Sequence, residues 1–157
     1  MKKIFLTALL SIIVCATSAK ASSESDAVLK FFDSFVTASN NYDKSMENYF
    51  MPTTKIERVV IKPDNTKASL IIPMSEYTSQ LKKGAILAKT IKYRNNFKDR
   101  KITKVGSDYK ITAVRFPNAD KEGLGCYYII TKIGNDYKIK TESWETKHQG
   151  FLKYIKE

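Results

Sequence analysis

The chain has 157 residues, with 27 basic and 16 acidic side chains and a formal net charge of +11. That length suits one domain with its own core and is too short for two ordinary ones. His148 is the only histidine, which excludes a histidine-based metal cluster and leaves a Ser-His-Asp triad without support. No HExxH, GxSxG, phosphate-binding loop or dinucleotide-binding glycine motif occurs, so we expect no metal and no cofactor.

The N-terminal residues have the order of a secretory signal peptide. Lys2-Lys3 precede an apolar run from Ile4 to Ala16, and small residues end at Ala19-Lys20-Ala21. The apolar run is about 13 residues long, below the roughly 20 needed to span a bilayer. We therefore predict a signal peptide at residues 1–21, a periplasmic or secreted product, and no transmembrane anchor.

Residues 22–157 are predicted to form a single α+β domain. Removing the three lysines of the signal leaves 24 basic side chains against 16 acidic ones, a net charge of +8. The lysines are scattered among acids, which is typical of a solvated surface. Attraction to an anionic partner, membrane surface or nucleic acid is the alternative, and an exported protein is not expected to meet nucleic acid.

Cys126 is the only cysteine that remains after cleavage, so the fold has no intramolecular disulfide. It lies in the apolar stretch from Gly125 to Ile133, which predicts a buried thiol. An intermolecular disulfide or a reactive nucleophile remains the alternative.

The first half of the mature chain contains helical patterns and a hairpin. Apolar residues recur at three- and four-residue steps from Val28 to Val36, which predicts an amphipathic helix to about Ser39. A second short helix is expected from Tyr42 to Phe50, and a third from Pro73 to Gly84. Between them, two β-rich runs around Pro63-Asp64-Asn65 predict a hairpin; the runs are Lys55 to Ile61 and Ala68 to Ile72.

The second half is predicted to be an antiparallel meander, with strands separated by turn residues. A short repeat supports this, because Lys104 to Ile111 resembles Lys132 to Ile139, as two similar hairpin turns would. The expected strands are Ala88 to Asn95, Lys101 to Val105, Tyr109 to Phe116, Leu124 to Ile133 and Tyr137 to Trp144.

This order of elements resembles the nuclear transport factor 2-like cone fold, the superfamily of ketosteroid isomerases and polyketide cyclases. The resemblance extends from Phe31-Phe32-Asp33-Ser34-Phe35 through Tyr49-Phe50-Met51-Pro52 to the run from Tyr137 to Trp144. It implies an α+β fold in which N-terminal helices pack on a curved antiparallel sheet, with a cystatin-like fold as the runner-up.

The resemblance also implies a pocket between sheet and helices, where an isomerase would need a carboxylate base and a neutral donor. Asp33, Asp43, Tyr49 and Tyr93 are conceivable parts of such a pair. Helical spacing turns Asp33 toward water, and no acid aligns with the family's catalytic positions, so no catalytic residue is assigned.

Strand alternation suggests a polar floor at the mouth of the pocket. Ile139 would share a face with Thr141, Ser143 and Glu145, and Arg115 would pair with Glu145. A structural ion pair is the competing interpretation. The predicted ligand-binding residues are Arg115, Thr141, Ser143, Glu145 and Tyr49.

The same alternation places Trp144 on the outer sheet face near Tyr127 or Tyr128, where exposed aromatic residues would support a homodimer. We expect an exported, non-enzymatic binding domain that holds a small apolar ligand or a protein partner. The alternatives are a weak acid-base enzyme of the isomerase or hydratase type and an accessory subunit of an envelope or secretion assembly.

Overall fold

The computed structural model describes residues 23–118 and 121–155, and the predicted signal peptide lies outside them. A helix at residues 23–40 comes first. It is followed by η1 (Lys44–Tyr49), β1 (Phe50–Ile61), β2 (Lys67–Ile72), α2 (Met74–Thr90), β3 (Asn95–Val105), β4 (Asp108–Pro117), β5 (Leu124–Ile133), β6 (Asp136–Thr146) and η2 (Gln149–Tyr154).

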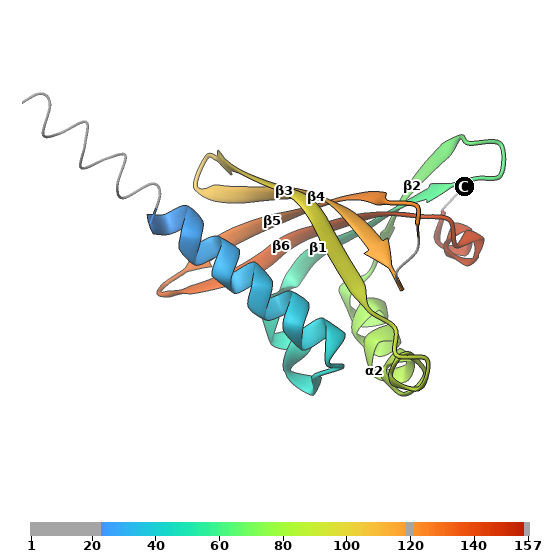
Figure 1. The fold of residues 1–157 in the computed structure, drawn as a ribbon, viewed down its shortest axis with the longest axis horizontal. Helices are drawn as coiled ribbons and strands as arrows, with labels where there is room; N and C mark the ends of the chain where they lie inside the picture. The colour runs from blue at the N-terminus through green and yellow to red at the C-terminus, as the bar shows by residue number, and fades with distance from the viewer. Residues whose placement is uncertain (1–22, 119–120, 156–157) are drawn as a thin grey trace, which may run out of the picture.

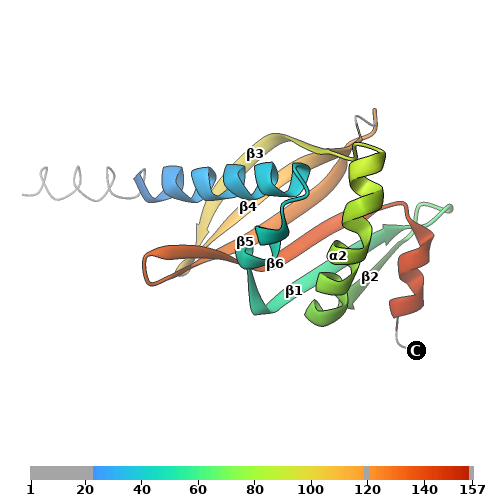
Figure 2. The same ribbon diagram turned by 90° about the horizontal axis from the view of Figure 1, so that it is seen from below.

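The six strands form one curved sheet in the order β2-β1-β6-β5-β4-β3. Four of the strand pairs are antiparallel, but β1 and β6 run parallel, so the sheet is mixed rather than wholly antiparallel as expected. The N-terminal helix and α2 lie on the same face of this sheet (Figure 1). Seen from below, α2 runs across the direction of the N-terminal helix (Figure 2). This is the α+β arrangement that the sequence predicts.

The N-terminal helix forms where its apolar spacing predicts. Val28, Phe32 and Phe35 recur on one face and are buried against the sheet. The Phe32 ring lies 4.8 Å from that of Tyr128 on β5, and the Phe35 ring 5.6 Å from that of Phe50 on β1. These aromatic contacts fill the concave face of the sheet beneath this helix.

Helix α2 differs from the prediction, because it continues through Gly84 and ends at Thr90. The strand expected from Ala88 to Asn95 is therefore wrong, and β3 begins only at Asn95. A helix-interior glycine costs roughly 1 kcal/mol relative to alanine, which the good helix formers on either side of Gly84 offset. Gly84 was thus a weak stop signal.

The two repeated turns are built alike, as the repeat predicts. Gly106 joins β3 to β4 and Gly134 joins β5 to β6, and each has a φ of 61°. A positive φ at the first central position of a two-residue hairpin loop favours glycine.

Strand β6 contains a bulge that the sequence pattern does not show. Ile129 of β5 pairs with Thr141, whereas its neighbour Ile130 pairs with Ile139, so Lys140 is an extra residue in β6. Beyond the bulge the alternation is reversed, and Glu142 shares the concave face with Ile139; both are fully buried. The predicted interior face is consequently wrong from Thr141 onward.

Candidate functional site

A cleft of about 690 Å³ opens between the end of the N-terminal helix, η1 and α2. Small-molecule sites typically enclose roughly 300–1,000 Å³. The lining is mainly apolar, with Met46 of η1 opposite Leu81, Ala85 and Ala88 of α2. The sheet contributes Asn95 of β3 and Trp144 of β6, while Tyr77 of α2 and Tyr93 from the turn after α2 complete the lining.

Trp144 lies between two buried arginines that come from strands on either side of it. The guanidinium carbon of Arg58, on β1, is 4.5 Å from the indole centroid, and that of Arg115, on β4, is 4.4 Å from it. Both distances are within the range of cation–π attraction. The indole Nε1 donates a hydrogen bond of 2.7 Å to the hydroxyl of Tyr128. These contacts hold the Trp144 ring in one orientation.

Below the cleft, a buried network holds Tyr77 in place. Arg58 Nη2 donates to Glu142 Oε1 at 2.7 Å, and the Tyr77 hydroxyl donates to the same oxygen at 3.1 Å. Burial lowers the pKa of Arg58, but the charge of Glu142, its hydrogen bond and the contributions of Tyr77 and Tyr128 together raise that pKa above its ordinary value. Burial, followed by the charge of Glu142, raises the pKa of Tyr77 well above its ordinary value. Tyr77 is therefore a protonated donor, and Glu142 is neutralised by Arg58.

Arg115 is buried without a carboxylate partner among the described residues. Its Nη1 donates to Asn95 Oδ1 at 3.0 Å and its Nη2 to the backbone carbonyl of Glu145 at 2.9 Å, while Nε has no hydrogen-bond partner. The expected ion pair with the Glu145 carboxylate is wrong, because that carboxylate accepts from Lys67 and from the Gly125 N–H. Arg115 instead supports the sheet side of the cleft from below.

The rim of the cleft is tied to the sheet by the turn after the N-terminal helix. Asn40 accepts from the Asn95 N–H at 2.8 Å and donates to the Asn95 carbonyl at 3.0 Å, and the Tyr42 hydroxyl donates to the Tyr93 carbonyl. The segment at residues 93–95 thus has a fixed position at the junction of α2 and β3.

The other predicted ligand-binding residues lie elsewhere. Because of the bulge in β6, Thr141 and Ser143 face the opposite side of the sheet, where Ser143 pairs with Glu57 of β1. Tyr49 packs on Phe31, with ring centroids 5.5 Å apart, under the N-terminal helix.

The expected outer aromatic cluster is also absent from the described residues. Trp144 lies on the concave face, and Tyr128 is fully buried. Tyr127 alone of the three occupies the outer face, where its hydroxyl donates to Glu57 at 3.0 Å. The reversed alternation after the bulge explains why Trp144 does not face outward.

The thiol of Cys126 is a packing group beside this site. Its Sγ lies 3.3 Å from the carbonyl oxygen of Ala113, and burial raises its pKa to about 12. It stays protonated at neutral pH, so a nucleophilic role has no structural support.

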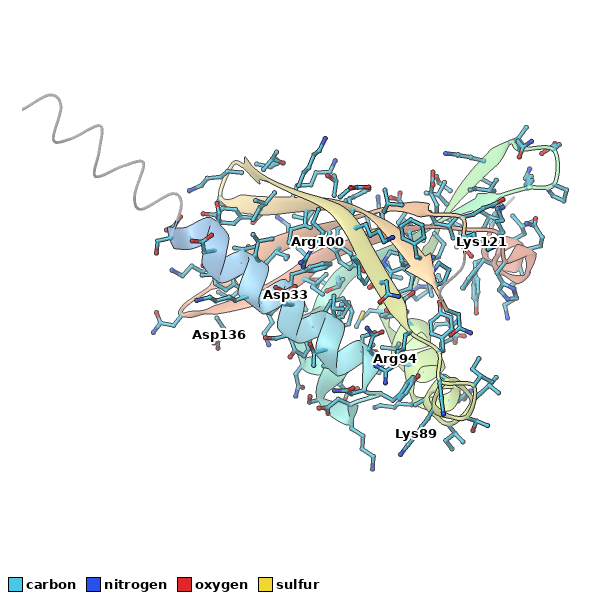
Figure 3. All side chains as sticks on the ribbon, in the orientation of Figure 1. Asp33, Lys89, Arg94, Arg100, Lys121 and Asp136 are labelled. Carbon is cyan, nitrogen blue, oxygen red and sulfur yellow. The ribbon has the colours of Figure 1, made fainter. Side chains whose placement is uncertain are left out.

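The acids named for a catalytic pair are not placed to act as bases. Asp33 is exposed and pairs with Arg100 of β3, and these two side chains point toward one another (Figure 3). Asp43 lies at the cleft but caps η1, and the hydrogen bond from the Ser45 N–H lowers its pKa. A general base for carbon acids works best with a pKa raised toward the ambient pH.

Within residues 23–118 and 121–155, no three His, Cys, Asp or Glu side chains are grouped to hold a metal ion. In the same part of the chain, no helix has the length and apolar character to cross a membrane.

No known family matches the sequence, and no curated protein is similar to it. Solved structures are similar in shape. A protein of unknown function from Pseudomonas putida, described as NTF2-like, has a TM-score of 0.63 at 8% identity, over 79% of this chain and 87% of that chain. A Novosphingobium aromaticivorans protein described as NTF2-like with a cystatin-like fold has a TM-score of 0.62 at 3% identity, over 90% and 95%. From the same organism, a candidate scytalone dehydratase has a TM-score of 0.55 at 14% identity, over 81% and 86%. Such identities show the fold alone, and the chain therefore has the nuclear transport factor 2-like fold.

Proposed function

We propose that this protein is an exported, non-enzymatic binding domain that holds a small apolar ligand in the cleft between η1 and α2. The observation that carries the proposal is the cleft itself, about 690 Å³ with mainly apolar walls and the aromatic side chains of Tyr77, Tyr93 and Trp144 in its lining. Export rests on the signal-like order of residues 1–21.

The aromatic residues of the cleft are held by hydrogen bonds within the protein. Tyr77 donates to Glu142, Trp144 to Tyr128, and Tyr93 to Asn95 Oδ1 at 3.3 Å. Their polar atoms are thus satisfied without a ligand, and what remains for contact is largely ring surface. A surface ordered in advance loses little conformational entropy on binding, which favours affinity.

The buried carboxylate does not support catalysis. Glu142 has no exposed surface, lies beneath Tyr77, and is paired with Arg58. A carboxylate buried in this way has no contact with a ligand in the cleft, which a general base would need. The candidate scytalone dehydratase of similar fold keeps an isomerase or hydratase as the alternative.

The test is a titration of the mature protein, residues 22–157, with the neutral fluorescent probe N-phenyl-1-naphthylamine. Ala85→Trp places a large side chain in the cleft, where it would occupy the space of the ligand. It should weaken binding about tenfold or more, which corresponds to a loss of about 1.4 kcal/mol or more in binding free energy. Ser34→Trp is the matched control, since Ser34 is exposed on the N-terminal helix and should leave the affinity unchanged.

Equal affinity of both variants for the probe would contradict binding in this cleft. Native mass spectrometry of the protein purified without refolding adds a second readout, in which a co-purified small molecule should be lost in Ala85→Trp and retained in Ser34→Trp.

A further inference from the structure

The C-terminal half of α2 and the turn after it combine exposed apolar and basic side chains. Residues 82–94 contain five basic side chains and no acidic one, and all five are exposed. Within the same segment Ile86, Leu87 and Ile91 are 79%, 65% and 52% exposed. Apolar side chains that keep more than half of their surface exposed gain little from burial when the protein folds, so folding accounts poorly for them.

Helical geometry turns Ile86 away from the core. Ile86 follows the buried Tyr77 by nine residues, which at about 100° per residue places it on the opposite face of α2. Lys89 and Arg94 lie at this same end of the molecule (Figure 3). The basic-apolar surface is defined by Lys82, Lys83, Ile86, Leu87, Lys89, Ile91, Lys92 and Arg94.

Most basic side chains of this surface have no ion-pair partner among the described residues. Lys82 pairs with Glu47 of η1 at 3.1 Å. Among residues 23–118 and 121–155, no ion pair within 4.0 Å involves Lys83, Lys89, Lys92 or Arg94. A partner that covers this surface should therefore carry negative charge around an apolar centre.

We propose that the basic-apolar surface docks on an anionic phospholipid membrane. Helices that lie in a membrane interface present Leu and Ile to the acyl chains, with Lys and Arg at the level of the headgroups. Anionic headgroups attract each basic residue near the surface by about 1 kcal/mol. A second copy of this chain fits less well, because like-charged surfaces would face each other.

Docking in this way would bring the cleft close to the lipid. Ile86 belongs to this surface and also lines the cleft, together with its neighbour Ala85. If the proposed function holds, acyl chains of membrane lipids are the class of apolar ligand that this geometry favours. Docking itself requires no ligand in the cleft, so the two proposals can fail separately.

The test is cosedimentation of the mature protein with vesicles of phosphatidylcholine, with and without phosphatidylglycerol. Binding should require phosphatidylglycerol and should weaken as salt is added. Lys83→Gln/Lys89→Gln/Lys92→Gln should bind about a hundredfold more weakly, from three losses of about 1 kcal/mol each. Ile86→Ser/Leu87→Ser should also bind weakly, because it removes the apolar anchor.

The matched control is Ile71→Ser/Ile133→Ser, which removes two apolar side chains that are 46% and 49% exposed away from α2. It should bind like the unaltered protein, and circular dichroism should show that all three variants are folded. The proposal is overturned if the control loses as much binding as Ile86→Ser/Leu87→Ser, or if neutral vesicles bind equally well. It is also overturned if no vesicle binds. Conversion of a dimer to a monomer by Ile86→Ser/Leu87→Ser in analytical ultracentrifugation would then assign this surface to a second copy of the chain.

Discussion

The two helices that cover the concave face of the sheet do so in opposite ways. The N-terminal helix inserts Phe32 and Phe35 into the sheet, with exposures of 0% and 2%, and fills the space beneath it. Helix α2 has 17 residues, and Tyr77 is the one residue that it buries. Apolar packing thus holds one half of the face closed, while the other half keeps room for a ligand.

The sheet beneath the two helices differs in the same way. Under the N-terminal helix it presents apolar and aromatic side chains such as Ile111, Tyr128 and Ile130. Under α2 it presents Trp144 and the buried pair of Arg58 and Glu142. A buried ion pair is weak evidence for stability, because desolvation offsets much of its attraction. This pair accordingly serves to hold Tyr77 and Trp144 in place.

The largest expected effect on stability is in the closed half, which is the part of the concave face under the N-terminal helix. Phe32→Ala should lower the free energy of unfolding by about 3–5 kcal/mol, because it leaves a cavity in a packed aromatic core. Leu81→Ala, in the half-buried wall of the cleft, should cost only about 1 kcal/mol. Urea denaturation followed by circular dichroism measures both. Equal losses would mean that the space under α2 is as tightly packed as the core.

The next effect concerns the polar network. Glu142→Gln should lower the free energy of unfolding by about 3 kcal/mol, because it leaves the Arg58 cation buried without a counter-charge. The amide can still accept from Tyr77, which keeps the loss at the lower end of the range for such pairs. Urea denaturation at neutral pH measures this loss.

Glu57→Gln is the matched control for the polar network, since Glu57 accepts from Tyr127 on the outer face and should cost less than about 1 kcal/mol. The double variant Arg58→Met/Glu142→Leu should recover much of the loss, as replacement of a buried pair by apolar groups often does. A loss in Glu142→Gln no larger than that in Glu57→Gln would contradict a buried, paired carboxylate.

Local patterns predicted the closed half well, and also the hairpin of β1 and β2 outside it. The apolar spacing of the N-terminal helix, the hairpin around Pro63-Asp64-Asn65 and the bounds of β5 were all confirmed. Each depends on residues close together in the sequence, which is where periodicity and turn preferences are informative.

The open half was predicted poorly, because its geometry depends on distant residues. The bulge at Lys140 is defined by pairing with β5, and the position of Arg58 beside Trp144 by the parallel pairing of β1 with β6. Strict alternation therefore placed Thr141 and Ser143 inside and Trp144 outside. The available signal for a buried arginine was that Arg58 directly precedes the apolar run Val59-Val60-Ile61. This signal does not identify the partner of the arginine.

The smallest effect tests whether α2 is optimised for stability. Gly84→Ala should raise the free energy of unfolding by roughly 0.5–1 kcal/mol, because glycine has more conformational freedom to lose on helix formation. A Cβ at this position would meet no atom within 4 Å. Gly106→Ala is the opposing control, since its φ of 61° should make alanine destabilising by about 1–2 kcal/mol. Thermal unfolding should therefore move in opposite directions in the two variants. A lower melting temperature in Gly84→Ala would show that α2 packs against something at Gly84, and that the contrast with the N-terminal helix is smaller than the cleft implies.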